Sequence, residues 1–209
     1  MKYNKDYFAH ARVGFFTHYT YATYRKADNY GGTKFSAQRL VGASSAEEAA
    51  AFFDGEKYAA AAHDLGAEYV VFTVCHAGFN LLYPSKVMGA CCPHKCTETS
   101  DVVQKLTDGL AKYDIPLVLY MPPNDERDML DEEMKAMGIF QNPEGKKDLL
   151  KKIIREIYDR YGNKIAGFWF DQGGPVREVC DFVRECNPDA VIFVNTGVTA
   201  NEIRHENSD

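Results

Sequence analysis

Residues 56–76 read EKYAAAAHDLGAEYVVFTVCH, and this stretch decides the fold. A helical pattern ends at Gly66, and after Ala67 a nearly continuous apolar run extends from 68 to 75. Continuous apolar runs are typical of parallel strands that are buried on both faces. A helix, a tight connection and a buried strand predict one unit of an α/β fold.

Four more segments have the same character as 68–75, namely 12–18 (RVGFFTH), 115–120 (IPLVLY), 165–171 (IAGFWFD) and 190–195 (AVIFVN). Helical patterns alternate with them over about 46–65, 100–113 with Ser100 as N-cap, 149–161, and 176–186 after Pro175. This alternation predicts five parallel strands in chain order, with the helices on the outer face. It also predicts an unpaired edge at 190–195.

The connections indicate where a site would form. Helix-to-strand connections are short, whereas three strand-to-helix connections are long, at 19–45, 77–99 and 121–141. Long loops of this kind gather at the carboxyl ends of the strands, where sites are built. Each strand ends in polar residues, and we expect these ends to converge: His18, Cys75 and His76, Tyr120, Asp171, and Asn195. Asp171 is the sharpest candidate, since a carboxylate beside apolar neighbours can act as a nucleophile or an acid/base.

Composition excludes several classes of protein. The 209 residues carry 24 Lys plus Arg against 30 Asp plus Glu, a net charge of −6, which argues against a nucleic-acid partner. No apolar run is long enough for a membrane span and the N-terminus has no signal-peptide core, so we expect no membrane partner and a cytoplasmic location.

The cysteines favour reduced thiols over a disulfide scaffold, since there are only 6 in the chain. CCPHKC at 91–96 offers soft ligands, but adjacent cysteines do not suit one tetrahedral ion, and we expect loop thiols rather than a metal site. We expect no cofactor.

Four stretches together resemble one known family: RVGFFTHYTYAT (12–23), FDGEKYAAAAHDLGAEYVVFTVCHAGFNLLYPSK (53–86), SDVVQKLTDGLAKYDIPLVLY (100–120) and IAGFWFDQGG (165–174). In this order they resemble the catalytic domain of the α-L-fucosidases of glycoside hydrolase family 29, over most of residues 7–195. The resemblance implies a (β/α)8 TIM barrel, of which this sequence has about the first five β/α units.

The same resemblance implies a retaining glycoside hydrolase that cleaves terminal α-L-fucosyl or related bonds of a fucose-containing oligosaccharide or glycoconjugate. Asp171 would be the nucleophile that forms a covalent glycosyl-enzyme intermediate. His18, His76 and Tyr120 would bind sugar hydroxyls, and Trp169 would shape the pocket. Imidazoles suit such recognition because they can both donate and accept hydrogen bonds.

Several residues depart from the family pattern. Cys75 and Ala77 replace a histidine and an aspartate, Tyr19 and Thr20 replace a tryptophan and a glycine, and Asn195 stands where an arginine is expected. A complete barrel takes about 250 residues, so we expect residues 1–209 to form a single domain that is incomplete at its C-terminus. The acid/base would then be Glu202 or Glu206, or would be absent or come from a partner chain.

Three alternatives remain open at this point. The chain could be a catalytically silent carbohydrate-binding relative, an inactive fragment, or an unrelated parallel α/β protein whose strand ends do not converge. An open barrel edge would favour self-association. The tyrosines at 19, 21, 24 and 30 could stack on a sugar or pack the first long loop against the rim.

Overall fold

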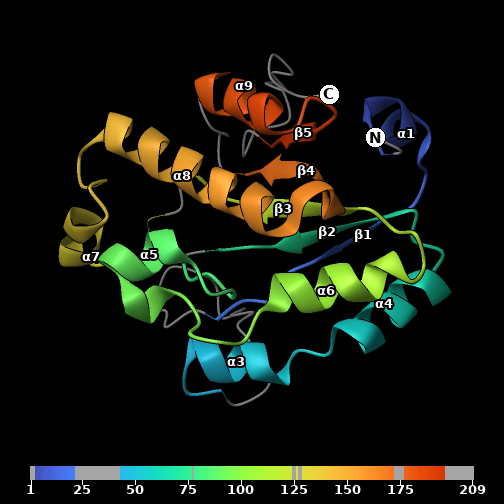
Figure 1. Ribbon diagram of the computed structural model, residues 1–209, viewed down its shortest axis with the longest axis horizontal. Coiled ribbons are helices and arrows are strands. Elements are labelled where there is room, and N and C mark those ends of the chain that lie inside the picture. The colour runs from blue at the N-terminus through green and yellow to red at the C-terminus, as the bar shows by residue number, and fades with distance from the viewer. Residues whose placement is uncertain are drawn as a thin grey trace.

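The computed structural model describes residues 3–21, 43–76, 78–123, 126, 129–171 and 177–195. Five strands form one parallel sheet in the order β1-β2-β3-β4-β5 (Figure 1). Their bounds are β1 (Gly14–Thr17), β2 (Tyr69–Thr73), β3 (Leu117–Met121), β4 (Ile165–Phe170) and β5 (Val191–Val194). The predicted strands, their direction and their order are therefore confirmed. β5 pairs with β4 and forms an edge of this sheet, as expected for 190–195.

The helices of the described residues are α1 (Lys5–His10), α3 (Ala46–Phe52), α4 (Gly55–Asp64), α5 (Lys86–Cys91), α6 (Val102–Ala111), α7 (Asp131–Ala136), α8 (Pro143–Tyr161) and α9 (Arg177–Cys186). The two long connections after β2 and β3 thus contain short helices. Side chains from α3 to α9 join one continuous apolar core on one face of the sheet. This arrangement is that of consecutive β/α units of a barrel.

Two predictions about helices are wrong. The single helix expected over 46–65 is two helices, because Asp54 caps the second by accepting a hydrogen bond from Lys57 N–H at 3.0 Å. The expected N-cap of α6 is Asp101, which accepts from Gln104 N–H at 2.8 Å, and not Ser100. The Ser100 hydroxyl instead donates to Glu47 of α3 at 2.7 Å.

The opposite, concave face of the sheet carries a separate and smaller cluster of buried residues: Val71, Val118, Tyr120, Ala166 and Val191. Helix α1, which the sequence did not predict, packs against this cluster. Its Phe8 ring lies 5.3 Å from the Tyr69 ring and 6.0 Å from the Phe193 ring. The expectation that helices cover only the outer face therefore holds for α3 to α9, and α1 is the exception.

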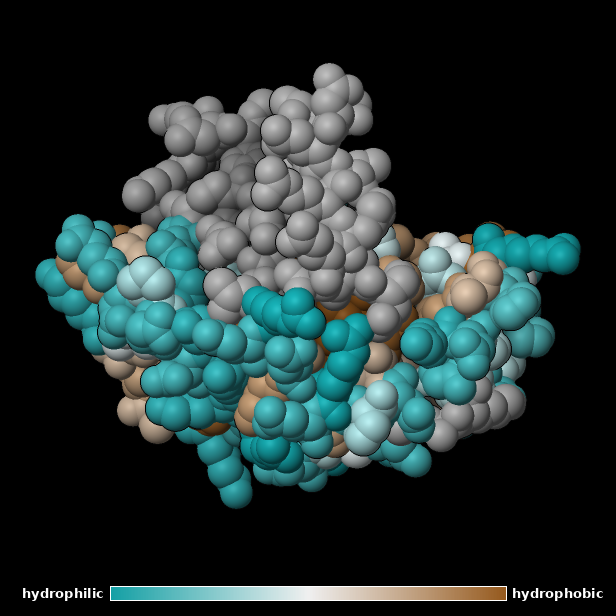
Figure 2. All heavy atoms as spheres, turned by 90° about the horizontal axis from the view of Figure 1, so that it is seen from above, coloured by the Kyte–Doolittle hydropathy of each residue, from teal (hydrophilic) through white to brown (hydrophobic). Residues whose placement is uncertain are grey.

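Hydrophilic residues cover most of the described surface seen in Figure 2. On the concave side, however, Phe16 of β1 keeps 40% of its surface exposed. Within the described ranges, no helix is long and apolar enough to cross a membrane.

Candidate functional site

The carboxylate of Asp171 lies where the ends of β3, β4 and β5 meet. The Tyr120 hydroxyl donates a hydrogen bond to Asp171 Oδ2 at 2.6 Å, and Asn195 Nδ2 donates to Oδ1 at 2.6 Å. Backbone bonds continue past the strands, from Asp171 N–H to Met121 O at 3.2 Å and from Asn195 N–H to Phe170 O at 2.7 Å. Both oxygens of the carboxylate are therefore held by groups on neighbouring strands.

Two imidazoles stand beside this carboxylate. The His18 ring lies 4.6 Å from the Tyr120 ring and 5.0 Å from the His76 ring, both edge-to-face. The His76 ring stacks on Tyr120 with centroids 5.6 Å apart and an interplanar angle of 10°. The segment after His18 is tied to β2, because Tyr19 N–H donates to Thr73 Oγ1 at 2.9 Å. Residues that are far apart in the sequence thus form one cluster.

Electrostatics keep both imidazoles neutral near pH 7. Desolvation and, to a smaller extent, the neighbouring His18 lower the pKa of His76 to about 4, against the opposing charge of Asp171. Desolvation also lowers the pKa of His18, again against the charge of Asp171. A neutral imidazole has one donor and one acceptor nitrogen, which suits adjacent sugar hydroxyls.

Aromatic rings line the concave side next to this cluster. Trp169 is half-buried and lies 5.3 Å from the Phe16 ring and 5.3 Å from the Phe193 ring. Phe16 also contacts His18 at 5.1 Å and Tyr120 at 5.7 Å, both edge-to-face. Sequence reasoning missed Phe16, which lies on β1 two residues before His18; the alternation of side chains along a strand could have indicated that the two lie on the same side.

The structure brings His18, His76, Tyr120 and Asp171 together, and it places Trp169 on the same face through Phe16. Asn195, expected among the converging strand ends and also noted as a departure from the family pattern, joins the site as a donor to Asp171. Cys75 does not join it, since its thiol is 1% exposed within the core on the helix-covered face. Glu202, Glu206 and Ala77 lie outside the described residues.

The first long loop lies partly outside the described residues, Tyr24 and Tyr30 included. Tyr19 and Tyr21 are packing residues: the Tyr19 hydroxyl donates to Ala49 O at 2.8 Å, and the Tyr21 hydroxyl donates to Ser44 O at 3.2 Å.

The cysteines of CCPHKC bond to main-chain groups. The thiols of Cys91, Cys92 and Cys96 donate to backbone carbonyls at 3.5–3.7 Å. Among the residues that the structure describes, no group of three or more His, Cys, Asp or Glu could hold a metal ion.

Comparison with known proteins identifies the relationship. The family model described as alpha-L-fucosidase matches residues 2–204. The chain belongs to the α-L-fucosidase family. No curated protein sequence matches this family member.

Solved structures of α-L-fucosidases share the fold of this fucosidase-family chain. A glycoside hydrolase family 29 enzyme from Bacteroides thetaiotaomicron superposes with a TM-score of 0.58 at 19% identity, over 89% of this chain and 49% of that one. Isoenzyme 1 from Paenibacillus thiaminolyticus gives 0.60 at 16% identity, over 93% and 51%. The enzyme AlfC from Lactobacillus casei gives 0.58 at 23% identity, over 92% and 69%.

The chain thus spans about half the length of the first of these structures. Fucosidase catalytic domains are (β/α)8 barrels, and the five parallel strands described above correspond to part of such a barrel.

Proposed function

We propose that this chain carries the nucleophile side of a retaining α-L-fucosidase site, which acts on terminal α-L-fucosyl bonds of an oligosaccharide or glycoconjugate. The observation that carries the proposal is the Asp171 carboxylate, held by Tyr120 and Asn195 beside two neutral imidazoles. Family membership supports it. So do two relatives: the Bacteroides enzyme has been trapped as a covalent intermediate, and the Lactobacillus enzyme is described in complex with α-L-fucose.

The chemistry follows from the geometry of the carboxylate. An Asp171 oxygen attacks the anomeric carbon, the glycosidic C–O bond breaks, and the leaving oxygen takes a proton from an acid. Water then attacks the same carbon, gives a proton to the conjugate base, and releases the sugar with its original anomeric configuration. Among the described residues, each oxygen accepts one bond from a neutral donor, and a carboxylate oxygen has a further lone pair, so these hydrogen bonds orient the nucleophile and leave it able to attack.

We propose that the imidazole and aromatic rings beside Asp171 bind the sugar. His18 and His76 would bind adjacent hydroxyls, while Trp169 and Phe16 would face the apolar side of the ring. The acid/base stays a prediction: Glu202 or Glu206, or a carboxyl of a partner chain. Self-association along the β5 edge also stays a prediction, which the oligomeric state in solution would test.

A covalent-labelling experiment tests the nucleophile separately from the acid/base. A dinitrophenyl fucoside with fluorine beside the anomeric carbon needs no protonation of its leaving group, so the wild-type chain should form a fucosyl adduct visible by intact mass. Asp171→Asn should form none, and its hydrolysis of a nitrophenyl α-L-fucoside should fall by at least about 10³-fold. Asp108→Asn is the control, because Asp108 is an exposed partner of Lys164 at 2.8 Å.

The outcomes separate the hypotheses. An adduct without turnover would mean that the acid/base must be supplied. Neither adduct nor hydrolysis from a folded protein, with aryl β-galactoside and α-mannoside also inert, would contradict the proposal. Retained binding of L-fucose in that case would indicate a silent carbohydrate-binding relative.

A further inference from the structure

The turn that carries His76 has an unfavourable backbone. Phe79 adopts a left-handed φ of 58° and Gly78 a φ of 82°, and Phe79 N–H donates to His76 O at 2.9 Å. A bulky side chain disfavours the left-handed region, so surrounding contacts must hold this conformation. Phe79 is only 4% exposed, and its buried ring supplies one of these contacts.

Lys95 supplies another contact from the loop at 91–96. Its ammonium Nζ donates to Gly78 O at 2.8 Å, and its own carbonyl accepts from Leu81 N–H at 2.7 Å. Its side chain is only 3% exposed. A buried lysine is costly unless its charge is paired, and its position is then set by its partners.

Glu133 of α7 is the partner of Lys95. Its Oε2 lies 3.3 Å from Lys95 Nζ and its side chain is 5% exposed. The same carboxylate accepts from Leu130 N–H at 2.8 Å and lies 2.8 Å from His94 Nε2. Burial alone would raise the pKa of Glu133, but these hydrogen bonds and the charge of Lys95 lower it to about 2. The Glu133 carboxylate is therefore ionised near pH 7, and its hydrogen bonds hold it in one position.

We propose that Lys95, fixed by Glu133, is a positioning residue that holds the Gly78 carbonyl and thereby directs the His76 imidazole toward His18 and Tyr120. A buried ion pair contributes little net stability, so the selection of one geometry is the role that this proposal gives to the pair. It thus suits the orientation of a binding group better than the support of the core. The proposal rests on the proposed function in one respect, namely that His76 contacts the sugar.

The matched control is Lys105, which also donates its Nζ to backbone carbonyls, at 2.9 Å to Ala50 O and 3.2 Å to Phe53 O. These carbonyls lie in α3 and at its end, not in the His76 turn. We would compare Lys95→Met, Glu133→Gln and Lys105→Met by the NMR resonance of His76 Cε1–H and by titration with L-fucose. The stacked and edge-to-face rings around His76 make its chemical shift a direct report of its orientation.

We expect the His76 resonance to move in Lys95→Met and Glu133→Gln but not in Lys105→Met. The dissociation constant for L-fucose should rise about tenfold in the first two variants, because a displaced His76 makes a weaker contact with the sugar. An unmoved His76 resonance in folded Lys95→Met or Glu133→Gln protein would overturn the proposal. An equal shift in Lys105→Met would also overturn it, as would failure of both Lys95→Met and Glu133→Gln to fold. If wild-type protein binds no fucose, the proposed function fails while the resonances still decide the positioning role.

Discussion

The two faces of strand β4 differ although their residues alternate along one short segment. Phe168 and Phe170 are fully buried on the helix-covered face, where their rings stack at 5.6 Å. Trp169 and Asp171 are only half-buried, on the concave side and at the strand end. Because side chains of a strand alternate between its faces, neighbouring residues of β4 lie in the core and on the concave side in turn. The helix-covered face stabilises the sheet, and the other presents chemical groups.

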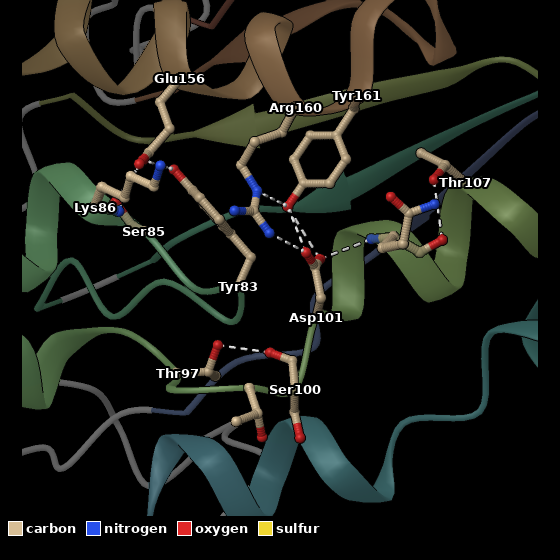
Figure 3. Close-up of polar contacts among 12 residues, drawn as sticks. Tyr83, Ser85, Lys86, Thr97, Ser100, Asp101, Thr107, Glu156, Arg160 and Tyr161 are labelled. Carbon is tan, nitrogen blue, oxygen red and sulfur yellow. Dashed lines mark hydrogen bonds and ion pairs between the residues drawn. The ribbon is translucent and has the colours of Figure 1, made fainter.

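The carboxylates of the two regions differ in the same way. On the helix-covered side, Asp101 accepts from Arg160 Nη2 at 2.7 Å and from the Tyr161 hydroxyl at 3.0 Å (Figure 3). In the described part of the chain, the hydrogen-bond donors to Asp171 are the neutral Tyr120 and Asn195. A cationic partner would draw charge from a nucleophile, whereas neutral donors orient it. The ionic partner at Asp101 therefore points to a structural role for that carboxylate.

Alanine at adjacent positions of β4 gives the sharpest test of this comparison. Phe168→Ala should lower the free energy of unfolding by about 3–5 kcal/mol, because its ring packs on Tyr158 at 5.8 Å and on Phe170. Trp169→Ala should cost only about 1 kcal/mol, since the ring is partly solvated, and should weaken fucose binding instead. Urea unfolding at pH 7 measures both. Equal losses of stability would contradict the division between the two faces.

Asp101→Ala tests the structural carboxylate. It removes the N-cap of α6 and leaves Arg160 without its ion-pair partner, so the loss of stability should be about 2–3 kcal/mol. Asp108→Ala on the same helix removes two exposed contacts, with Lys164 at 2.8 Å and with Gln104 Nε2 at 2.7 Å, and should cost less than about 1 kcal/mol. Urea midpoints of the two variants compare them. A similar midpoint for both would mean that the partly exposed network of Asp101, Arg160 and Tyr161 adds nothing beyond a surface pair.

The sequence predicted the sheet and much of the site because both follow local rules. Continuous apolar runs gave the strands, and polar residues at their ends gave His18, His76, Tyr120 and Asp171. The sequence prediction missed the break between α3 and α4 although its cap, Asp54, is local. The close packing of α4 on α6 depends instead on a distant contact, since a Cβ on Gly55 would lie 2.2 Å from Lys105 O. Asn195 was expected at the converging strand ends, but its role as a donor to Asp171 was not, because a strand-end position does not specify a hydrogen-bond partner. The burial of Lys95 could not be predicted either, because its partner Glu133 lies on a distant segment of the chain.

The pH dependence of the free energy of unfolding tests a further structural carboxylate, that of Glu47. Glu47 accepts five hydrogen bonds from Glu98, Thr99 and Ser100, which outweigh its desolvation and lower its pKa from 4.5 to about 2. Because the pKa of Glu47 is lower in the folded state than in the unfolded state, its carboxylate contributes to the free energy of unfolding above pH 4.5. This contribution is lost as the pH falls toward 2. Glu47→Gln should cost about 1 kcal/mol at pH 7, after allowance for solvent screening, and flatten this pH dependence. Urea unfolding across that range, with the exposed Glu56→Gln as control, measures the difference. An unchanged slope would show that the hydrogen bonds from residues 98–100 do not hold the Glu47 carboxylate in solution.

The smallest expected effect lies within the site itself. The charge of Asp171 raises the pKa of His18 and His76 against the larger lowering by desolvation. Asp171→Asn removes that charge but keeps an amide of the same shape, so the NMR titration midpoints of both imidazoles should fall, that of His76 from about 4. Asp108→Asn, at an exposed carboxylate that pairs with Lys164, is the control variant and should leave both midpoints in place. A rise at His18 or His76 would mean that Asp171 does not face the imidazoles, and the concave side would lose the electrostatic contact that distinguishes it from the helix-covered side.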